Sequence, residues 1–408
     1  MNILERQKDI LSIISSLDIS PTMFKNAVEK YNAIANYLRN HGLEADMYPQ
    51  GSFAFGTVVR PTHRAPDAAY DLDFICQVKG CRDDHTPSDL RRHIEDILTS
   101  SDLYDGKLKA CEECFTIEYA DINGVGFSID IVPATAENMA TKQKLAALSR
   151  NPTLIDTAIV IPKHNGERNY SWLTNNPKGF RSWFDNINKP FMDNTRDTFR
   201  RRLYEQNQAC FATVEEIPHE LDRSPLQRVI QILKYHRNVY YTHIPAGSDL
   251  KPISAILNVT VAQIAENYRA DCSTFELLDH VLSEMMVYAH QLELTSKQFE
   301  VQFGDRNVFS KREGKWVIMN PADPEDNLAD KWNVDSRIPQ MFFKWIKAAN
   351  NDLVLAVQTA DDRKFRSALE NGFDSEYVSK ILGDKYCKDV AAPKAIPTQR
   401  APKPYGGL

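Results

Sequence analysis

The sequence predicts an α+β fold in which a sheet domain packs against a mainly helical C-terminal domain. In residues 44–133, short runs with the two-residue period of strands alternate with turns and helices. From residue 224 onward, most segments show the 3.6-residue period of amphipathic helices. With 408 residues, the chain is long enough for two domains. We expect the functional site in the cleft between the two halves, because ligand sites commonly form at domain interfaces.

The first half is predicted to begin with a helix and to continue into a small twisted sheet. Ser20-Pro21 suits a helix start, apolar residues then recur every three or four positions, and Gly42 ends the pattern. Asn123-Gly124 separates two β-rich runs and predicts a hairpin, because both residues accept the positive φ of such a turn. The expected strands are Ala45–Gln50, Asp71–Val78, Phe115–Ala120 and Val125–Val132, with a helix over Ser88–Ser101.

The second half is predicted to be mainly helical. Ser224-Pro225 caps a helix that continues to Tyr240, whereas Phe299 to Met319 has β character. Proline-spaced residues near the end predict a flexible extended tail. Further helices are expected over residues 252–268, 274–293 and 335–372. We divide the chain into a first domain at 1–215, a helical domain at 216–385 and a tail at 386–408.

Charge and composition restrict the class of protein. The chain has 49 Lys plus Arg against 55 Asp plus Glu, a formal net charge of −6, which argues against a protein that coats DNA or RNA. No apolar run approaches the roughly 18 residues of a membrane span, and the N-terminal residues do not form a signal peptide. Seven cysteines, an odd number, indicate a reducing compartment. We therefore expect a cytoplasmic protein.

Cys111 and Cys114 are the closest pair of cysteines in the sequence. A structural zinc site needs about four ligands, and no second pair follows at a suitable spacing. We expect a strand start with two buried thiols here instead of a metal site.

Three aspartates and a Gly-Ser turn carry the predicted chemistry. Asp71 and Asp73 alternate on one strand, so their carboxylates project to the same side, and Asp130 can join them from the neighbouring hairpin strand. Crowded carboxylates repel one another unless a cation binds among them, and their oxygens suit Mg²⁺. Two such ions about 4 Å apart would hold the attacking and leaving oxygens of an in-line phosphoryl displacement. Gly51 and Ser52, at a strand-to-helix turn, would cradle a phosphate.

Each of these features alone has a plain structural explanation. A Gly-Ser pair is commonly just a turn, and Asp-x-Asp can be a solvated strand face. The conjunction favours function, because all the parts occur in the right order on the expected turn and strands.

The motifs that carry this chemistry resemble a known family. GSFAFGTVVRP, YDLDFICQV and FSIDIVPA are similar to the nucleotidyltransferase superfamily of DNA polymerase β. More closely, they resemble the CD-NTases, the bacterial cyclic GMP-AMP synthase-like and DncV-like enzymes of anti-phage signalling operons. In the second half, SPLQRVIQILKYHR, KPISAIL and NPADPEDNLADKW resemble further segments of the same family, so that the resemblance covers roughly residues 45–370.

The resemblance implies a polymerase β-like catalytic domain and a Mg²⁺-dependent activity. The expected reaction joins ATP, GTP or other nucleoside triphosphates into a cyclic di- or trinucleotide, with release of pyrophosphate, in anti-phage (CBASS) signalling. Asp71 and Asp73 would bind two Mg²⁺ ions, for which Mn²⁺ can substitute, and Asp130 would bind the ion that activates the attacking hydroxyl. The implied nucleotide-binding residues are Gly51, Ser52, Lys234 and Ser254.

The resemblance also implies partners. A downstream effector would bind the product, and a ligase that acts like a ubiquitin-transfer enzyme could join the tail ending in Tyr405-Gly406-Gly407-Leu408 to targets. A tail without a role is the equal alternative. Neither a membrane partner nor activation by DNA is expected, since the net charge is negative and no zinc ribbon is present.

Other functions and several product properties stay open. One alternative is a template-independent RNA-tailing or 2′-5′ oligoadenylate-type polymerase with the same aspartates. Others are an inactive scaffold and a nucleotidylating resistance enzyme or toxin. Ala255 stands where related animal enzymes have a base-stacking aromatic residue, so base identity does not follow. Linkage, ring size, activating signal and oligomeric state are equally open.

Several conspicuous residues are assigned to structure. His236 is expected at the surface, because successive helical residues turn away from the face of Lys234. The basic run Arg200-Arg201-Arg202, with Lys189 and Arg196, is expected to be a solvated helix face. The aromatic residues expected to pack between the two halves are Trp172, Trp183 and Phe184.

Overall fold

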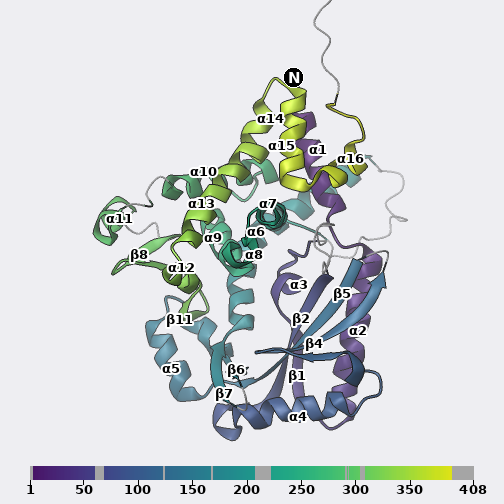
Figure 1. Ribbon diagram of the computed structural model, residues 1–408, viewed down its shortest axis with the longest axis vertical. Helices are drawn as coiled ribbons and strands as arrows, with labels where there is room; N and C mark the ends of the chain where they lie inside the picture. Colours follow the sequence, from purple (N-terminus) through teal and green to yellow (C-terminus); the bar gives the residue numbers. More distant parts are fainter. Residues whose placement is uncertain are drawn as a thin grey trace, which may run out of the picture.

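The computed structural model shows a sheet domain below a helical half (Figure 1). The expected α+β architecture is confirmed. The structure describes residues 3–59, 69–122, 125–166, 169–206, 222–289, 292, 294–303 and 308–387.

The first half contains a seven-stranded mixed sheet. Its spatial order is β1-β2-β5-β4-β3, and β6 and β7 continue from β5. β2 and β5 are parallel, whereas β4 and β5 pair antiparallel, so the predicted hairpin is confirmed although residues 123–124 lie outside the described ranges. The strands are β1 Ala45–Pro49, β2 Ala69–Cys81, β3 Leu108–Ala110, β4 Phe115–Ile122, β5 Val125–Ala136, β6 Ile159–His164 and β7 Tyr170–Asn175.

Two helices, α2 (Pro21–Asn40) and α4 (Pro87–Thr99), cover one face of this sheet. Their apolar side chains form one buried cluster with the central strands, and Leu72 and Phe74 of β2 belong to it. Ile75 belongs to a separate cluster with β5 and β6, so the alternation of β2 places one set of side chains on each face. The chemistry-bearing residues of β2 lie opposite the α2–α4 core.

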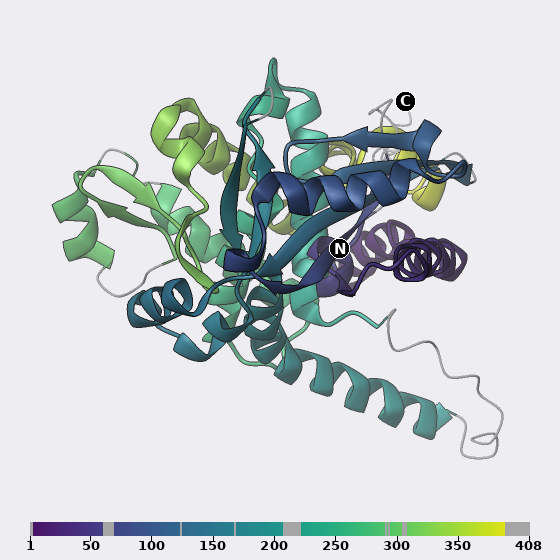
Figure 2. The same cartoon turned by 90° about the horizontal axis from the view of Figure 1, so that it is seen from below.

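The second half is built around α7 (Pro225–Thr242), whose side chains are buried on nearly every side. As predicted, Ser224 caps this helix, and its Oγ accepts from the Gln227 amide. The main core also includes residues of α1 (Ile3–Ser16) and α6 (Pro177–Gln206). Figure 1 shows α1 beside the C-terminal helices, and Figure 2 shows the far end of α6 projecting from the molecule.

The remaining elements complete the helical half and its small strand pairs. The helices are α3 Gly51–Phe55, α5 Met139–Leu148, α8 Gly247–Leu250, α9 Ser254–Glu266, α10 Thr274–Ala289, α11 Ser296–Phe303, α12 Asp330–Val334, α13 Arg337–Ala349, α14 Ala356–Gln358, α15 Asp362–Phe373 and α16 Ser375–Leu382. The short strands are β8 Ser310–Arg312, β9 Lys315–Val317, β10 Met319–Asn320 and β11 Asp323–Asn327.

One prediction about the second half needs correction. The β character expected from Phe299 is wrong at its start, because residues 296–303 form α11 and only short strands follow. The helical pattern expected over 335–372 corresponds to several helices, with a π-helical turn at Asn350–Leu355 and a new N-cap at Asp361. Within the described ranges, no helix is both long and apolar enough to cross a membrane.

Candidate active site

Asp71, Asp73 and Asp130 come together on the sheet. The parallel pairing of β2 and β5 sets Asp73 opposite Asp130. One carboxylate oxygen of each residue lies within 4.8 Å of the other two. Asp71 is exposed, and the other two are half-buried. The period-two pattern of β2 and the parallel pairing of β2 with β5 thus bring the three acids into one cluster.

The electrostatics of this cluster favour a cation. Burial, followed by repulsion from Asp71 and Asp130, raises the pKa of Asp73 to about 8 against the attraction of Lys234. Burial also raises the pKa of Asp130, although a hydrogen bond from Thr116 opposes that shift. Three hard oxygen donors that repel one another fit a divalent ion such as Mg²⁺.

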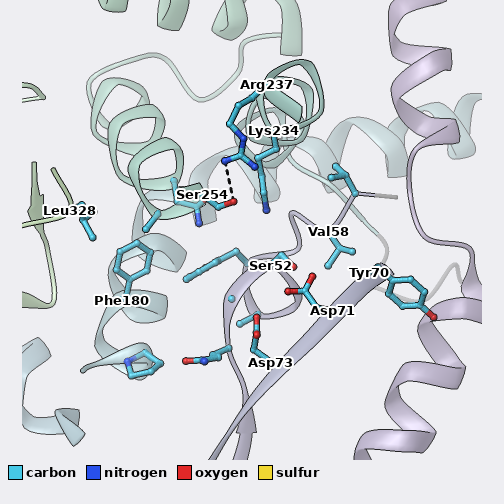
Figure 3. Close-up of a pocket in the computed structure, with 18 of the residues that line it drawn as sticks. Ser52, Val58, Tyr70, Asp71, Asp73, Phe180, Lys234, Arg237, Ser254 and Leu328 are labelled. Atoms are coloured by element: carbon cyan, nitrogen blue, oxygen red, sulfur yellow. Dashed lines mark hydrogen bonds between the residues drawn. The ribbon is translucent and has the colours of Figure 1, made fainter. Parts of the chain in front are cut away.

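Gly51 is required where α3 approaches β2. Its φ is +63°, and a Cβ atom there would lie 2.5 Å from Oδ2 of Asp73. The amide of Gln50 donates to the carbonyl of Asp73 at 2.8 Å, which holds the turn against the strand. Ser52 follows in the first turn of α3, and Figure 3 shows it beside Asp71.

One polar stripe of α7 faces the loop that follows α3. Gln227, Gln231 and Lys234 lie on this stripe because they are spaced by one helical turn. They donate to the backbone carbonyls of Phe55 at 2.8 Å, Val58 at 2.8 Å and Thr57 at 3.2 Å, respectively. The stripe therefore joins the two halves and directs the Lys234 ammonium toward Ser52, as Figure 3 shows.

Lys234 is buried, with 6% of its surface exposed. Burial, and then Arg237, lower the pKa of Lys234 to about 8, whereas Asp71 and Asp73 act in the opposite direction. Its ammonium makes hydrogen bonds only to Thr57 in the described part of the chain. An anionic ligand in front of Ser52 would supply the negative charge that this cation lacks.

Arg237 holds the start of α9. Its Nη1 donates to the carbonyl of Pro252 at 2.9 Å and to Oγ of Ser254 at 3.3 Å (Figure 3). Arg237 is buried, and burial lowers its pKa to about 10. This contact orients Ser254 toward the same space as Lys234.

A cavity of about 610 Å³ connects these groups. The sheet domain contributes Ser52, Asp71 and Asp73, and the helical half contributes Lys234 and Ser254. Beyond Ser254, Figure 3 shows Phe180 and Leu328 on the side away from the aspartates. The cavity can therefore hold an extended molecule with phosphates at one end and a flat apolar group at the other.

Sequence reasoning missed polar residues of this region. Thr116 donates from Oγ1 to Oδ1 of Asp130 at 2.6 Å. Asn258, Asn320 and Asp326 line the cavity. Asn258 directly follows the KPISAIL segment, and Asn320 and Asp326 lie within NPADPEDNLADKW, but the resemblance assigned no role to these three residues. Thr116 lies opposite Asp130 through a register shift in the hairpin, which a single sequence does not signal.

Two assignments of single residues are wrong. His236 is fully buried, because α7 is surrounded by other helices and has no surface face at that position. Cys111 is exposed and Cys114 half-buried, because residues 111–114 form a turn ahead of β4 that the buried guanidinium of Arg91 holds by its carbonyls and not by its thiols.

The remaining assignments have mixed outcomes. Trp183 and Phe184 belong to the main core, and Phe184 packs on Phe55 of the first half, as expected. Trp172 is only half-buried and lies on β7 outside that core. Lys189 is exposed and pairs with Asp193 at 2.6 Å. The side chains of residues 196–206, which include the arginine run, lie outside the described part of the structure.

Comparison with known proteins agrees with this geometry. Residues 45–133 match the family model described as "Cyclic GMP-AMP synthase DncV-like, nucleotidyltransferase domain". The chain is 25% identical over 351 residues to a c-di-GMP synthase of Roseivirga ehrenbergii, covering 84% of this chain and 76% of that protein. It is also 25% identical over 327 residues to the cyclic dinucleotide synthase CdnG of Bradyrhizobium diazoefficiens, covering 78% of this chain and 68% of that protein.

The fold is likewise similar to solved structures. The structure of Bradyrhizobium diazoefficiens CdnG in complex with GTP has a TM-score of 0.64 at 20% identity, covering 93% of this chain and 98% of that chain. At this identity the likeness establishes the arrangement of the two halves, and the chemistry rests on the residues described above.

Proposed function

The chain belongs to the CD-NTase family of nucleotidyltransferases, and from this premise we propose that it joins nucleoside triphosphates into a cyclic oligonucleotide second messenger. The observation that carries the proposal is the cavity in which Asp71 and Asp73, clustered with Asp130, face a buried lysine and a serine. Carboxylates suited to divalent ions and a cation suited to phosphate are what nucleotidyl transfer requires. The names of the two curated relatives support the cyclic product.

We assign metal binding to the three aspartates. Asp71 and Asp73 would hold two Mg²⁺ ions, or Mn²⁺ in their place, and Asp130 would share one of them. When bound, the ions neutralise the phosphates and lower the pKa of the attacking ribose hydroxyl. Asp130, whose pKa is raised by burial, is suited to accept the proton of that hydroxyl.

We assign phosphate binding to Gly51, Ser52, Lys234 and Ser254. Gly51 lets the backbone approach, Ser52 offers a hydroxyl, and the Lys234 ammonium points toward Ser52 (Figure 3). Ser254, held by Arg237, would contact the same phosphates. Together they would keep pyrophosphate in line with the attacking oxygen. The linear intermediate would then turn in the cavity for the next transfer.

We propose GTP as one substrate. The support is that one curated relative is named a c-di-GMP synthase and that the solved CdnG structure contains GTP. The proposed setting is anti-phage (CBASS) signalling in the cytoplasm, where a separate effector would read the product.

The C-terminal tail supports a further proposed partner. Residues 388–408 lie outside the described structure, but the chain leads into them from Tyr386, whose hydroxyl donates to Asp9 at 2.6 Å. A ligase could then act on the end of the tail. Deleting residues 395–408 should abolish any conjugate in cells while leaving synthesis by the purified protein unchanged; a conjugate that persists would contradict this proposal.

The central experiment is product analysis. Purified protein is incubated with all four nucleoside triphosphates and Mg²⁺ or Mn²⁺, treated with phosphatase and analysed by mass spectrometry. We expect a phosphatase-resistant species at the mass of a cyclic di- or trinucleotide. Asp71→Asn and Asp73→Asn should abolish it, whereas Asp46→Asn should not, because Asp46 is an exposed aspartate of the same sheet outside the cavity. A ladder of linear products would instead favour a polymerase.

A further inference from the structure

The cavity continues past Ser254 to a polar end that the phosphate chemistry does not use. Asn258 lies one turn after Ser254 on α9 and is only 5% exposed. Its Oδ1 is buried and has no hydrogen-bond partner among the described residues. Because such an oxygen is costly to leave unpaired, it indicates a hydrogen donor on a bound molecule.

Asp326, on β11, lines the same cavity. Its Oδ2 accepts from Nδ2 of Asn320 at 2.9 Å, and Oδ1 of Asn320 accepts from the amide of Ala322 at 3.0 Å. These two bonds fix the side chain of Asn320. Asn320 therefore holds Asp326 in place but provides no second hydrogen-bond donor to its carboxylate. The other carboxylate oxygen of Asp326 makes no hydrogen bond within the described residues.

The nature of the bound group follows from its surroundings. With phosphates at Ser52 and Lys234, the remaining part of a nucleotide extends past Ser254 toward Phe180 and Leu328 (Figure 3). An aromatic ring and an aliphatic side chain suit the faces of a base, and the small Ala255 leaves room on α9. The edge of that base would meet Asn258 and Asp326.

We propose that Asp326 and Asn258 select guanine at this end of the cavity. The inference rests on the proposed nucleotidyl transfer only for the direction in which the nucleotide lies. Guanine presents two donor groups along one edge, N1–H and the 2-amino group. Asp326 accepts from N1–H, and Oδ1 of Asn258 accepts from the 2-amino group. Adenine presents one donor and an acceptor, N1, which the carboxylate repels.

The test measures binding without turnover. Isothermal titration calorimetry in Mg²⁺ compares the α,β-methylene analogues of GTP, ATP and ITP, which cannot release pyrophosphate. The wild-type protein should bind the guanosine analogue about tenfold to a hundredfold more tightly than the adenosine analogue, as expected for hydrogen bonds to a charged group. Asp326→Asn should remove most of this preference by weakening only guanosine binding. Glu325→Gln is the matched control, because Glu325 is exposed, pairs with Lys144 and does not line the cavity.

A second comparison isolates Asn258. Inosine lacks the 2-amino group, so Asn258→Ala should weaken binding of the guanosine analogue and leave the inosine analogue unchanged. Equal wild-type affinities for guanosine and adenosine, or an equal loss of both in Asp326→Asn, would overturn the assignment. Selective guanosine binding together with a linear product would support the guanine assignment and contradict the proposed cyclisation. A cyclic product made of adenine alone would support the cyclisation and contradict the guanine assignment.

Discussion

Asp73, at the proposed metal site, opposes the stability of the fold. Its pKa of about 8 in the folded protein exceeds the usual carboxyl value near 3.9, so ionising it costs stability as the pH rises between those values. We predict that Asp73→Asn, in EDTA, raises the melting temperature at pH 9 by a few degrees, about 2–4 °C for each kcal/mol recovered, with a smaller change at pH 5.

The same substitution should abolish nucleotide transfer. Thermal unfolding by circular dichroism at both pH values, alongside Asp46→Asn, measures the stability effect. A lower melting temperature of the Asn variant at pH 9 would mean that the aspartate cluster stabilises the metal-free fold, contrary to the burial and repulsion described above.

Thr116 is a positioning residue for Asp130. Its hydroxyl donates to the carboxylate at 2.6 Å and lowers the pKa of that group against burial. We predict that Thr116→Val reduces the rate of product formation by about tenfold to a hundredfold, as supporting residues of metal ligands do, and raises the Mg²⁺ concentration needed for half-maximal rate. Thr116→Ser should restore both. A Val variant with normal metal dependence would show that Thr116 only packs.

Local rules found the aspartates but not their supporting residue. Asp71 and Asp73 follow from strand period, and Asp130 follows from its place in the hairpin. Counting back from Asn123-Gly124 would set Ile117 opposite Asp130, but a register shift between Tyr119 and Ile122 puts Thr116 there instead. Such a bulge has no reliable signal in one sequence.

At the scale of an element, α7 carries both the site and the centre of the helical core. The prediction that His236 is exposed was wrong because it assumed one buried face, whereas α7 is enclosed. Nδ1 of His236 accepts from Nε1 of Trp345 at 3.0 Å, so Nε2 carries the hydrogen and donates to Asp352 at 3.2 Å. The histidine thus satisfies two groups that come from more than a hundred residues away.

We predict that His236→Leu destabilises the protein by about 2–4 kcal/mol, because it leaves the buried Trp345 N–H without an acceptor and Asp352 without its donor. Urea unfolding followed by tryptophan fluorescence measures the change. His93→Leu, at an exposed position of α4, should have little effect. Equal stabilities of the two variants would contradict the role assigned to this network.

The helices that sequence reasoning misjudged are those shaped by distant contacts. Residues 299–303 have the aromatic and β-branched composition of a strand, yet they form α11, in which Phe299 and Phe303 are one turn apart and pack on Tyr288. Tertiary packing outweighs intrinsic preference in so short a segment.

At the scale of the whole molecule, the first helix packs against the last described segment of the chain. Tyr377 donates to the carbonyl of Ser16 at 2.6 Å, and Lys385 pairs with Asp9 at 2.7 Å. Helix α1 thereby belongs to the core of the C-terminal helices, although the sequence places it with the first domain. A periodic pattern shows that a helix has a buried face but not which distant segment covers it.

Arg6 lies at the centre of the contact between α1 and the C-terminal helices, and its substitution can test that contact. It is 2% exposed, its guanidinium donates to the carbonyls of Val357 and Thr359, and it pairs with Asp362 at 2.6 Å. Because these bonds come from the end of α14 and the start of α15, Arg6→Met should leave both helix ends unsatisfied and cost about 2–4 kcal/mol in the free energy of unfolding.

Lys8→Met is the matched control, because Lys8 is exposed on the same helix. In urea unfolding, the Arg6 variant should lose stability in a transition that includes the C-terminal helices, as hydrogen exchange in residues 356–382 would show. If exchange rises in α1 alone, the N-terminal helix is an appendage and not part of the core. Lys234 and His236 lie on α7, at the centre of that core. The Arg6 variant should therefore also bind nucleotide more weakly as the urea concentration approaches the midpoint of its unfolding transition. This loss of binding should precede the unfolding of the sheet domain.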